Sequence, residues 1–287
     1  SDGSWALRLG YPAPVADFTL SHMLGWRDER LAVIADLKRT SPGRRLGELI
    51  DVRKAMMVRP ALDAAFALGA RAAMVSTDRI FYSGSPEDLA EASAHVRGKE
   101  QVLGCGLPVI AKDIVVDPLQ IARAACLGAN AVLLIAGACP QKLPSLLDTC
   151  TVMGVEAVVE VHTADEARLA GESGASLLLV NERDRETGEL VVGQAISVAA
   201  ALPPDATCLA GGGVSMIEQV RDLRAAGYDG VVLGRPLAAG GGDELMRQIS
   251  QELWQQRLAE PIQLNIKGKA HGARGDGAGW PGSALKP

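Results

Sequence analysis

Three apolar runs of the chain carry, at or near their ends, side chains that can exchange protons. Asp36 and Lys38 close the run that begins at Ala32, Lys112 closes another, and Glu160 lies near the end of a third. A lysine beside a carboxylate keeps its charge readily in a poorly hydrated site, and such neighbours tune one another's pKa. These residues have the composition of an acid–base site with a cationic anchor for an anionic substrate.

Glycines after the last two apolar runs carry a second signal. Gly211 begins three consecutive glycines, and Gly234 is followed by Arg235. Glycine lets a ligand approach the backbone N–H groups closely, and an arginine adds a fork of donors, so both suit a phosphate. We therefore expect a phosphate site made of Gly212, Gly213, Gly234 and Arg235. The alternative is a tight turn from strand to helix with no ligand.

Eight apolar runs, alternating with amphipathic stretches, must position these groups. The runs have the length and composition of buried strands, and they are residues 32–37, 72–76, 107–112, 131–136, 155–161, 176–181, 206–211 and 230–234. Helical patterns lie between them, for example at residues 86–96, 117–129, 164–175 and 215–228. Asp117 and Pro118 form a typical helix start, an N-cap followed by proline at the first helical position.

Eight strands in regular alternation with helices favour one architecture. We predict an α/β fold, a single (β/α)8 TIM barrel, in which catalytic groups gather at the C-terminal ends of the strands. The barrel takes residues 1–254, including a short N-terminal extension over residues 1–31. Residues 255–287 are Gly-rich and aperiodic, and we expect them to form a flexible tail. No G-x-G-x-x-G follows the first strand, which argues against a dinucleotide-binding fold.

The composition limits the classes of molecule that the protein could bind. The 287 residues are 48% hydrophobic but only 3% aromatic, so aliphatic side chains must fill the core. The net charge of −5 argues against nucleic acid, and no apolar stretch approaches the ~18–20 residues of a membrane span. We expect a small phosphorylated molecule as the partner, and association with a larger assembly stays open.

The number and spacing of the cysteines indicate the kind of cellular compartment in which the protein works. The five cysteines are an odd number, with no C-x-x-C pair and no histidine at ligand spacing. Scattered thiols are typical of a reducing environment, so we expect an intracellular protein of the cytoplasm or a plastid stroma. Neither a metal site nor a cofactor is expected.

The charged strand ends resemble those of the indole-3-glycerol-phosphate synthase family. Residues 36–43 stand where that family has E-I-K-x-x-S-P-S, residues 77–85 where it has T-D-x-x-Y-F-x-G-S, and residues 112–120 where it has K-D-F-x-x-D-P-x-Q. Its shorter motifs A-V-L-L-I, V-E-V-H and N-x-R-[DN] match residues 131–135, 159–162 and 181–184. The motifs occur in order at compatible spacing, and the resemblance covers residues 30 to 240.

The resemblance implies a lyase of tryptophan biosynthesis. Such an enzyme closes the indole ring of 1-(2-carboxyphenylamino)-1-deoxyribulose 5-phosphate with loss of CO2 and water. Lys112 would be the general acid, Glu160 would assist proton transfer in the later dehydration, and Lys38 would anchor a substrate anion. Asp36 and Asn181 would complete the catalytic set. The expected substrate-binding residues are Ser41, Tyr82, Leu133, Ile135 and Arg183.

Several positions depart from the family pattern. Asp36 replaces a glutamate, Ile114 replaces a phenylalanine, and Gly211 and Gly212 stand where the family has a glutamate and a serine. One carboxylate that would organise the two lysines is therefore missing. Two alternatives to an active ring-closing enzyme stay open: an impaired barrel that acts as a binding or structural subunit, and a different phosphosugar enzyme on the same scaffold.

Overall fold

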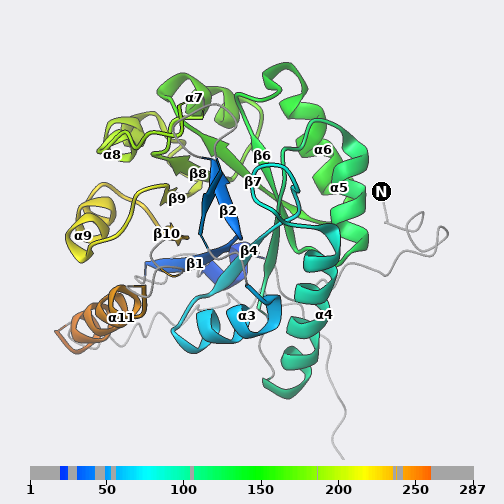
Figure 1. The fold of residues 1–287 in the computed structure, drawn as a ribbon. Coiled ribbons are helices and arrows are strands. Elements are labelled where there is room, and N and C mark those ends of the chain that lie inside the picture. Colours follow the sequence, from blue (N-terminus) through cyan, green and yellow to red (C-terminus); the bar gives the residue numbers. More distant parts are fainter. Residues whose placement is uncertain are drawn as a thin grey trace, which may run out of the picture.

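The computed structural model describes residues 20–24, 31–42, 49–52, 56–103, 107–185, 187–234, 237 and 242–259. Its centre is a closed barrel of eight parallel strands in the order β1-β10-β9-β8-β7-β6-β5-β4 (Figure 1). The barrel strands are β1 (Ala32–Leu37), β4 (Ala72–Ser76), β5 (Val109–Lys112), β6 (Ala131–Ile135), β7 (Glu156–Val161), β8 (Leu177–Asn181), β9 (Thr207–Gly211) and β10 (Gly230–Leu233). The predicted barrel is confirmed, and the predicted first and last residue of each strand lie within two residues of the observed ones.

Helices surround the barrel (Figure 1). They are α3 (Val58–Ala67), α4 (Pro86–Leu103), α5 (Pro118–Cys126), α6 (Leu143–Met153), α7 (Ala164–Glu172), α8 (Gln194–Val198), α9 (Ile217–Ala225) and α11 (Gly242–Ala259). Short 3-10 turns, η1 (Pro140–Lys142) and η2 (Ala199–Ala201), flank α6 and α8. Asp117 caps α5 as expected, because its side chain accepts a hydrogen bond from the backbone N–H of Leu119.

The strands alternate between an inner and an outer layer of apolar side chains. Side chains of successive strand residues point to opposite faces, so one set packs against the helices and the other fills the barrel. The interior cluster consists of Ala32, Ile34, Ala72, Met74, Ile110, Ala131, Leu133, Val158, Leu177, Leu179, Leu209 and Val232, together with Leu20 and Leu24. A packed interior leaves only the ends of the barrel for polar chemistry.

The short helix α2 (Leu20–Leu24) closes the N-terminal end of the barrel. Leu20 and Leu24 belong to the interior cluster, and the backbone N–H of Ser21 donates to Glu156, the first residue of β7, at 3.1 Å. Burial of a leucine side chain contributes roughly 1.5–3 kcal/mol. Part of the predicted N-terminal extension is thus a plug that seals the barrel at the end opposite the strand C-termini.

The C-terminal boundary differs from the expectation in one respect. Residues 255–259 belong to α11, which runs to Ala259, so the segment expected to be aperiodic from residue 255 begins within a helix. The remainder of the predicted tail, residues 260–287, lies outside the described residues, as do residues 1–19 and Arg235. A search of the described helices finds none long and apolar enough to cross a membrane.

Candidate active site

Asp36 and two lysines form the charged centre of the barrel mouth. The Oδ2 atom of Asp36 accepts from Lys38 Nζ at 2.5 Å and from Lys112 Nζ at 3.0 Å. Asp36 and Lys112 follow the interior residues Ile34 and Ile110 by two positions, and the strand period of two therefore turns them inward. One carboxylate oxygen thus holds both ammonium groups that the sequence placed at two separate strand ends.

Burial sharpens the electrostatics of this triad. Asp36 and Lys112 each expose only 7% of their surface. Burial alone raises the pKa of Asp36, but the charges of Lys112 and Lys38 outweigh it and lower that pKa to about 2. Burial alone lowers the pKa of Lys112, but the charge of Asp36, followed by those of Tyr82 and Glu160, raises it above its ordinary value. At neutral pH the carboxylate is therefore ionised and the Lys112 ammonium carries a proton.

Tyr82 covers the two lysines. Its ring centroid lies 4.8 Å from Lys112 Nζ and 5.9 Å from Lys38 Nζ, within the range of a cation–π interaction. The backbone carbonyl of Tyr82 accepts from the N–H groups of Arg39 and Thr40, each at 3.2 Å. The residues after β1 and the loop after β4 therefore hold each other in place above the charged centre.

Arg39 strengthens that attachment, and sequence reasoning did not give it a role. Its guanidinium donates to the two carboxylate oxygens of Asp88, at 2.6 and 2.8 Å, and to the carbonyl of Ser83 at 3.2 Å. Asp88 lies in the first turn of α4. A two-pronged Arg–carboxylate pair fixes orientation as well as distance, so the chain after Lys38 is tied to α4. The sequence signal for Arg39 was a second cation directly after Lys38, but only the fold supplies its partner Asp88.

Glu160 lies on the inner wall within a second polar group. Its Oε1 atom is 2.9 Å from His162 Nε2, and the side chain of Asn181 also favours the ionised form of this carboxylate. Burial raises the pKa of Glu160, but the hydrogen bond and charge of His162, then Lys112 and Asn181, lower it on balance. Glu160 is therefore an ionised, buried carboxylate that can accept a proton.

The predicted phosphate-binding glycines adjoin this centre. Gly212 has a φ of +97°, and a Cβ there would lie 2.2 Å from Asn181 Oδ1, so no other residue fits without a shift. A Cβ at Gly234 would lie 3.1 Å from Asp36 Oδ2 and 3.3 Å from Lys38 Nζ. The fold brings Gly212 beside Asn181, and Gly234 beside Asp36 and Lys38.

Gly213 and Arg183 help to shape that loop. A Cβ at Gly213 would lie 2.3 Å from Leu190, so this glycine is covered by an apolar side chain. The guanidinium of Arg183 donates to the carbonyl of Gly212 at 3.1 Å and to that of Gly188 at 2.6 Å. Arg183 therefore joins the loop after β8 to the loop after β9.

The other expected substrate-binding residues lie at different depths. Ile135 is half-buried and pairs in register with Glu160, whereas Leu133 is 1% exposed and belongs to the interior cluster one layer below. Ser41 is buried in β2 (Thr40–Pro42), which pairs with β3 (Leu49–Asp51) outside the barrel. Of Ile135, Leu133 and Ser41, Ile135 is therefore the residue that lies at the level of the charged groups.

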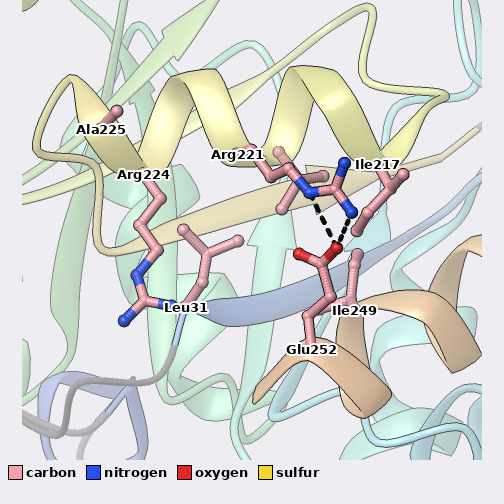
Figure 2. A pocket seen from close by; sticks show the side chains of 8 residues that line it. Leu31, Ile217, Arg221, Arg224, Ala225, Ile249 and Glu252 are labelled. Carbon is pink, nitrogen blue, oxygen red and sulfur yellow. Dashed lines mark hydrogen bonds and ion pairs between the residues drawn. The ribbon is translucent and has the colours of Figure 1, made fainter. Parts of the chain in front are cut away.

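A groove on the outside of the barrel has a different character. It has a volume of about 330 Å³ and lies between α9 and α11, where an Arg221–Glu252 ion pair spans it (Figure 2). Leu31, which lines it, precedes β1, so the groove lies toward the opposite end of that strand from Asp36. Within the described part of the chain, no three His, Cys, Asp or Glu side chains gather as a metal site.

Comparisons with known proteins agree with the geometry of the mouth. A family model described as indole-3-glycerol phosphate synthase matches residues 8–250. A protein of that name from Mycolicibacterium gilvum is 36% identical over 231 residues, which cover 80% of this chain and 78% of the relative. Relatives from Chlorobium luteolum and Streptomyces coelicolor, the latter named indole-3-glycerol phosphate synthase 2, are 34% and 35% identical. They match over 78% and 79% of this chain and over 80% and 82% of their own lengths.

Solved structures support the fold alone. Thiamine phosphate pyrophosphorylase from Pyrococcus furiosus superposes with a TM-score of 0.56 at 14% identity, over 79% of this chain and 98% of that one. An N-acetylmannosamine-6-phosphate 2-epimerase from Clostridium perfringens gives a TM-score of 0.55 at 13% identity, over 82% of this chain and 98% of that one. Since this barrel hosts many chemistries, these two likenesses carry no information on the reaction.

Proposed function

The chain belongs to the indole-3-glycerol phosphate synthase family, and from that premise we propose which of its residues close the indole ring. The enzyme is a lyase of tryptophan biosynthesis that acts on 1-(2-carboxyphenylamino)-1-deoxyribulose 5-phosphate and releases CO2 and water. One observation carries the assignment of roles: the ammonium groups of Lys38 and the buried Lys112 share Asp36 Oδ2, and the ionised Glu160 lies on the same inner wall.

Lys112 is the general acid of ring closure. The ring carbon that bears the carboxylate attacks the ketone carbon, the new C–C bond forms, and the carbonyl electron pair moves to oxygen. An alkoxide is a stronger base than an amine, so a protonated lysine can supply the proton even though its pKa is raised. Proton transfer of this kind typically contributes ~10²–10⁴-fold to the rate.

Lys38 holds the substrate carboxylate until it leaves. Its ammonium is fixed by Asp36 at 2.5 Å and is therefore oriented before the substrate arrives, which lowers the entropic cost of binding. When the bond between ring and carboxylate breaks, CO2 departs and its electron pair restores the aromatic ring. Asp36 thus performs the organising task that a second carboxylate shares in other family members.

Glu160 acts in the dehydration. The hydroxyl made in the first step takes up a proton and leaves as water, and the neighbouring carbon loses a proton to the Glu160 carboxylate. The double bond of the indole then forms between these two carbons. Over the whole reaction two protons are donated and one is recovered, so each turnover takes up one proton from solution.

The substrate phosphate binds to the loops after β9 and β10. The support is the left-handed Gly212, which lets the loop after β9 pass close to Asn181, and Arg183, which donates to the Gly212 carbonyl. Gly234, next to Lys38, brings the second loop to the same place, and Arg235 follows it in the sequence. Backbone N–H groups at such loops are a common phosphate site in this fold.

The free cysteine thiols support a cellular compartment for the enzyme. The cysteines that the structure describes, at positions 126, 139, 150 and 208, are free, which suits a reducing compartment. We therefore assign the enzyme to the interior of the cell, either the cytoplasm or a plastid stroma. The binding-subunit and other-enzyme alternatives gain no support from the triad or from the relatives.

A direct assay tests the function. The purified chain, incubated with the carboxyphenylamino deoxyribulose phosphate, should generate indole fluorescence at a rate that saturates with substrate. The matched control is Lys112→Met, which keeps the length of the side chain and removes the proton. A wild-type chain that binds inorganic phosphate and stays folded, yet forms no indole product, would favour the binding-subunit alternative.

A further inference from the structure

His162 is buried against a catalytic carboxylate, and the roles assigned above leave it without a task. It follows β7 directly and lies two residues after Glu160, so both side chains face the inner wall. The imidazole exposes 8% of its surface, and its Nε2 atom is 2.9 Å from Glu160 Oε1. Its other nitrogen, Nδ1, is buried and has no hydrogen-bond partner among the residues that the structure describes.

Two helices fix His162 through its backbone. The N–H of His162 donates to Glu166 Oε2 in α7 at 2.7 Å, and the side-chain amide of Gln194 in α8 donates to the His162 carbonyl. Arg185 in turn holds Glu166 at 3.1 Å. The backbone that carries the imidazole is therefore held on both sides by contacts within the protein itself.

The contact with Glu160 shows which ring nitrogen of His162 acts as the hydrogen-bond donor. An ionised Glu160 carboxylate only accepts, so Nε2 must carry the proton in this pair. The geometry thus supplies Glu160 with a fixed donor.

We propose that His162 is a positioning residue for ring closure, whose Nε2–H orients the Glu160 carboxylate toward Lys112 and keeps it ready to accept a proton. Asn181 from β8 also favours the ionised form of the same carboxylate. Among the described residues, Lys112, Asp36 and Tyr82 are ionisable groups near this carboxylate, and Lys38 is bound to Asp36. The inference rests on the proposed role of Glu160, but its central claim concerns two side chains of the free protein.

The effects that set the pKa of Glu160 predict how this pKa should change when His162 is replaced. Burial favours the neutral acid, and the hydrogen bond from His162 is the largest of the effects that oppose it, ahead of Lys112 and Asn181. Without His162 the pKa of Glu160 should rise, since a hydrogen bond to a charged group is strong and burial is unchanged. A protonated Glu160 cannot take the proton released in the dehydration.

Three substitutions separate positioning from packing. His162→Gln retains an amide N–H that can reach the place of Nε2, His162→Asn is too short to reach it, and His162→Leu removes the donor while filling much of the volume. Each full-length variant is compared with wild type by the pH profile of kcat. The acid limb should move to higher pH by about one pH unit or more in the Leu and Asn variants and return toward wild type in the Gln variant.

A second measurement does not need turnover. The carboxyl 13C resonances of glutamate-labelled protein are titrated, and Glu160 is identified by its loss in Glu160→Gln. The Glu160 resonance should titrate at higher pH in the Leu and Asn variants than in wild type and the Gln variant. If the wild-type chain makes no indole product, the proposed function fails, and this titration still decides on His162.

Two results would overturn the proposal. One is a Glu160 resonance and an acid limb that do not move in a folded Leu variant. The other is a Gln variant that behaves like the Asn variant, which would show that the donor itself is irrelevant. Should the Leu variant fail to fold, the comparison of the Gln and Asn variants gives the decision.

Discussion

Replacing Asp36 by asparagine tests whether one carboxylate organises both lysines. The substitution keeps the shape of the side chain, removes its charge and replaces one carboxylate oxygen by an NH2 group. In wild type, Asp36 Oδ2 contacts Lys38 at 2.5 Å and Lys112 at 3.0 Å. In the variant two largely buried ammonium groups would face each other without that anion, so they should separate, and each should bind its proton less tightly.

The loss of stability expected for Asp36→Asn follows from the pKa of the Asp36 carboxylate. It is lowered from 3.8 to about 2 in the folded protein, and at about 1.4 kcal/mol per pKa unit the ionised form is stabilised by roughly 2–3 kcal/mol. Breaking a buried ion pair on one side commonly costs about 3–5 kcal/mol. We therefore expect Asp36→Asn to lower the free energy of unfolding by roughly 2–4 kcal/mol and the Tm by about 4–8 °C.

The pH dependence has a definite sign. The folded pKa of Asp36 is depressed, so its contribution is complete above the unfolded value near 3.8 and is lost as the pH falls toward 2. Calorimetric Tm values of wild type and Asp36→Asn should differ at pH 6 and converge between pH 4 and pH 2. In the indole assay, kcat/KM of the variant should fall at least about 100-fold.

Companion variants distinguish charge from packing. Asp36→Glu restores the residue typical of the family and should retain stability and measurable turnover. Asp36→Asn combined with Lys38→Met removes one unbalanced cation and should recover part of the Tm but none of the activity. Gly211→Glu in the Asp36→Asn background should recover part of the activity, although a Cβ there lies 3.1 Å from Val232 Cβ.

Two outcomes would refute the reasoning about Asp36. An Asp36→Asn chain with the wild-type Tm at pH 6 would mean that the two lysines do not depend on this carboxylate. Near wild-type turnover in the same variant would mean that the lysines keep their catalytic orientation without it. Either result would return the lysines to the status of solvated strand-end charges.

Three further predictions concern the rest of the molecule. Lys112→Ala should lower kcat at least about 100-fold with an unchanged circular dichroism spectrum, and a variant with near wild-type turnover would remove Lys112 from the mechanism. Crystals soaked in concentrated phosphate or sulfate should show an anion between the loops after β9 and β10; a pocket left empty there would contradict the phosphate site. A chain truncated after Ile266 should melt within about 2 °C of the full chain, since residues 267–287 lack apolar periodicity; a much lower melting temperature would show that they are docked.

The barrel and its inner wall could be predicted from the sequence because both follow from short-range regularities. Apolar runs separated by amphipathic stretches specify strands and helices one by one, and eight such units close into a barrel. The strand period of two then decides which residues face inward, so Asp36 could be predicted to lie above Ile34, and Glu160 above Val158. The resemblance of the motifs to one family supplied the reaction, as the comparisons then confirmed.

Contacts between strands far apart in the sequence were decided only by the tertiary structure. The sequence places Lys112 76 residues after Asp36, and the pairing of β1 with β4 and of β4 with β5 brings these two side chains to one end of the barrel. The tertiary structure alone also decided the contact of Arg39 with Asp88, that of Gln194 with His162, and the place of α2 as a plug. Local pattern fixes the direction of a side chain because it depends on a few neighbouring dihedral angles. Its partners depend on how the whole chain closes, and that information is spread over every strand of the barrel.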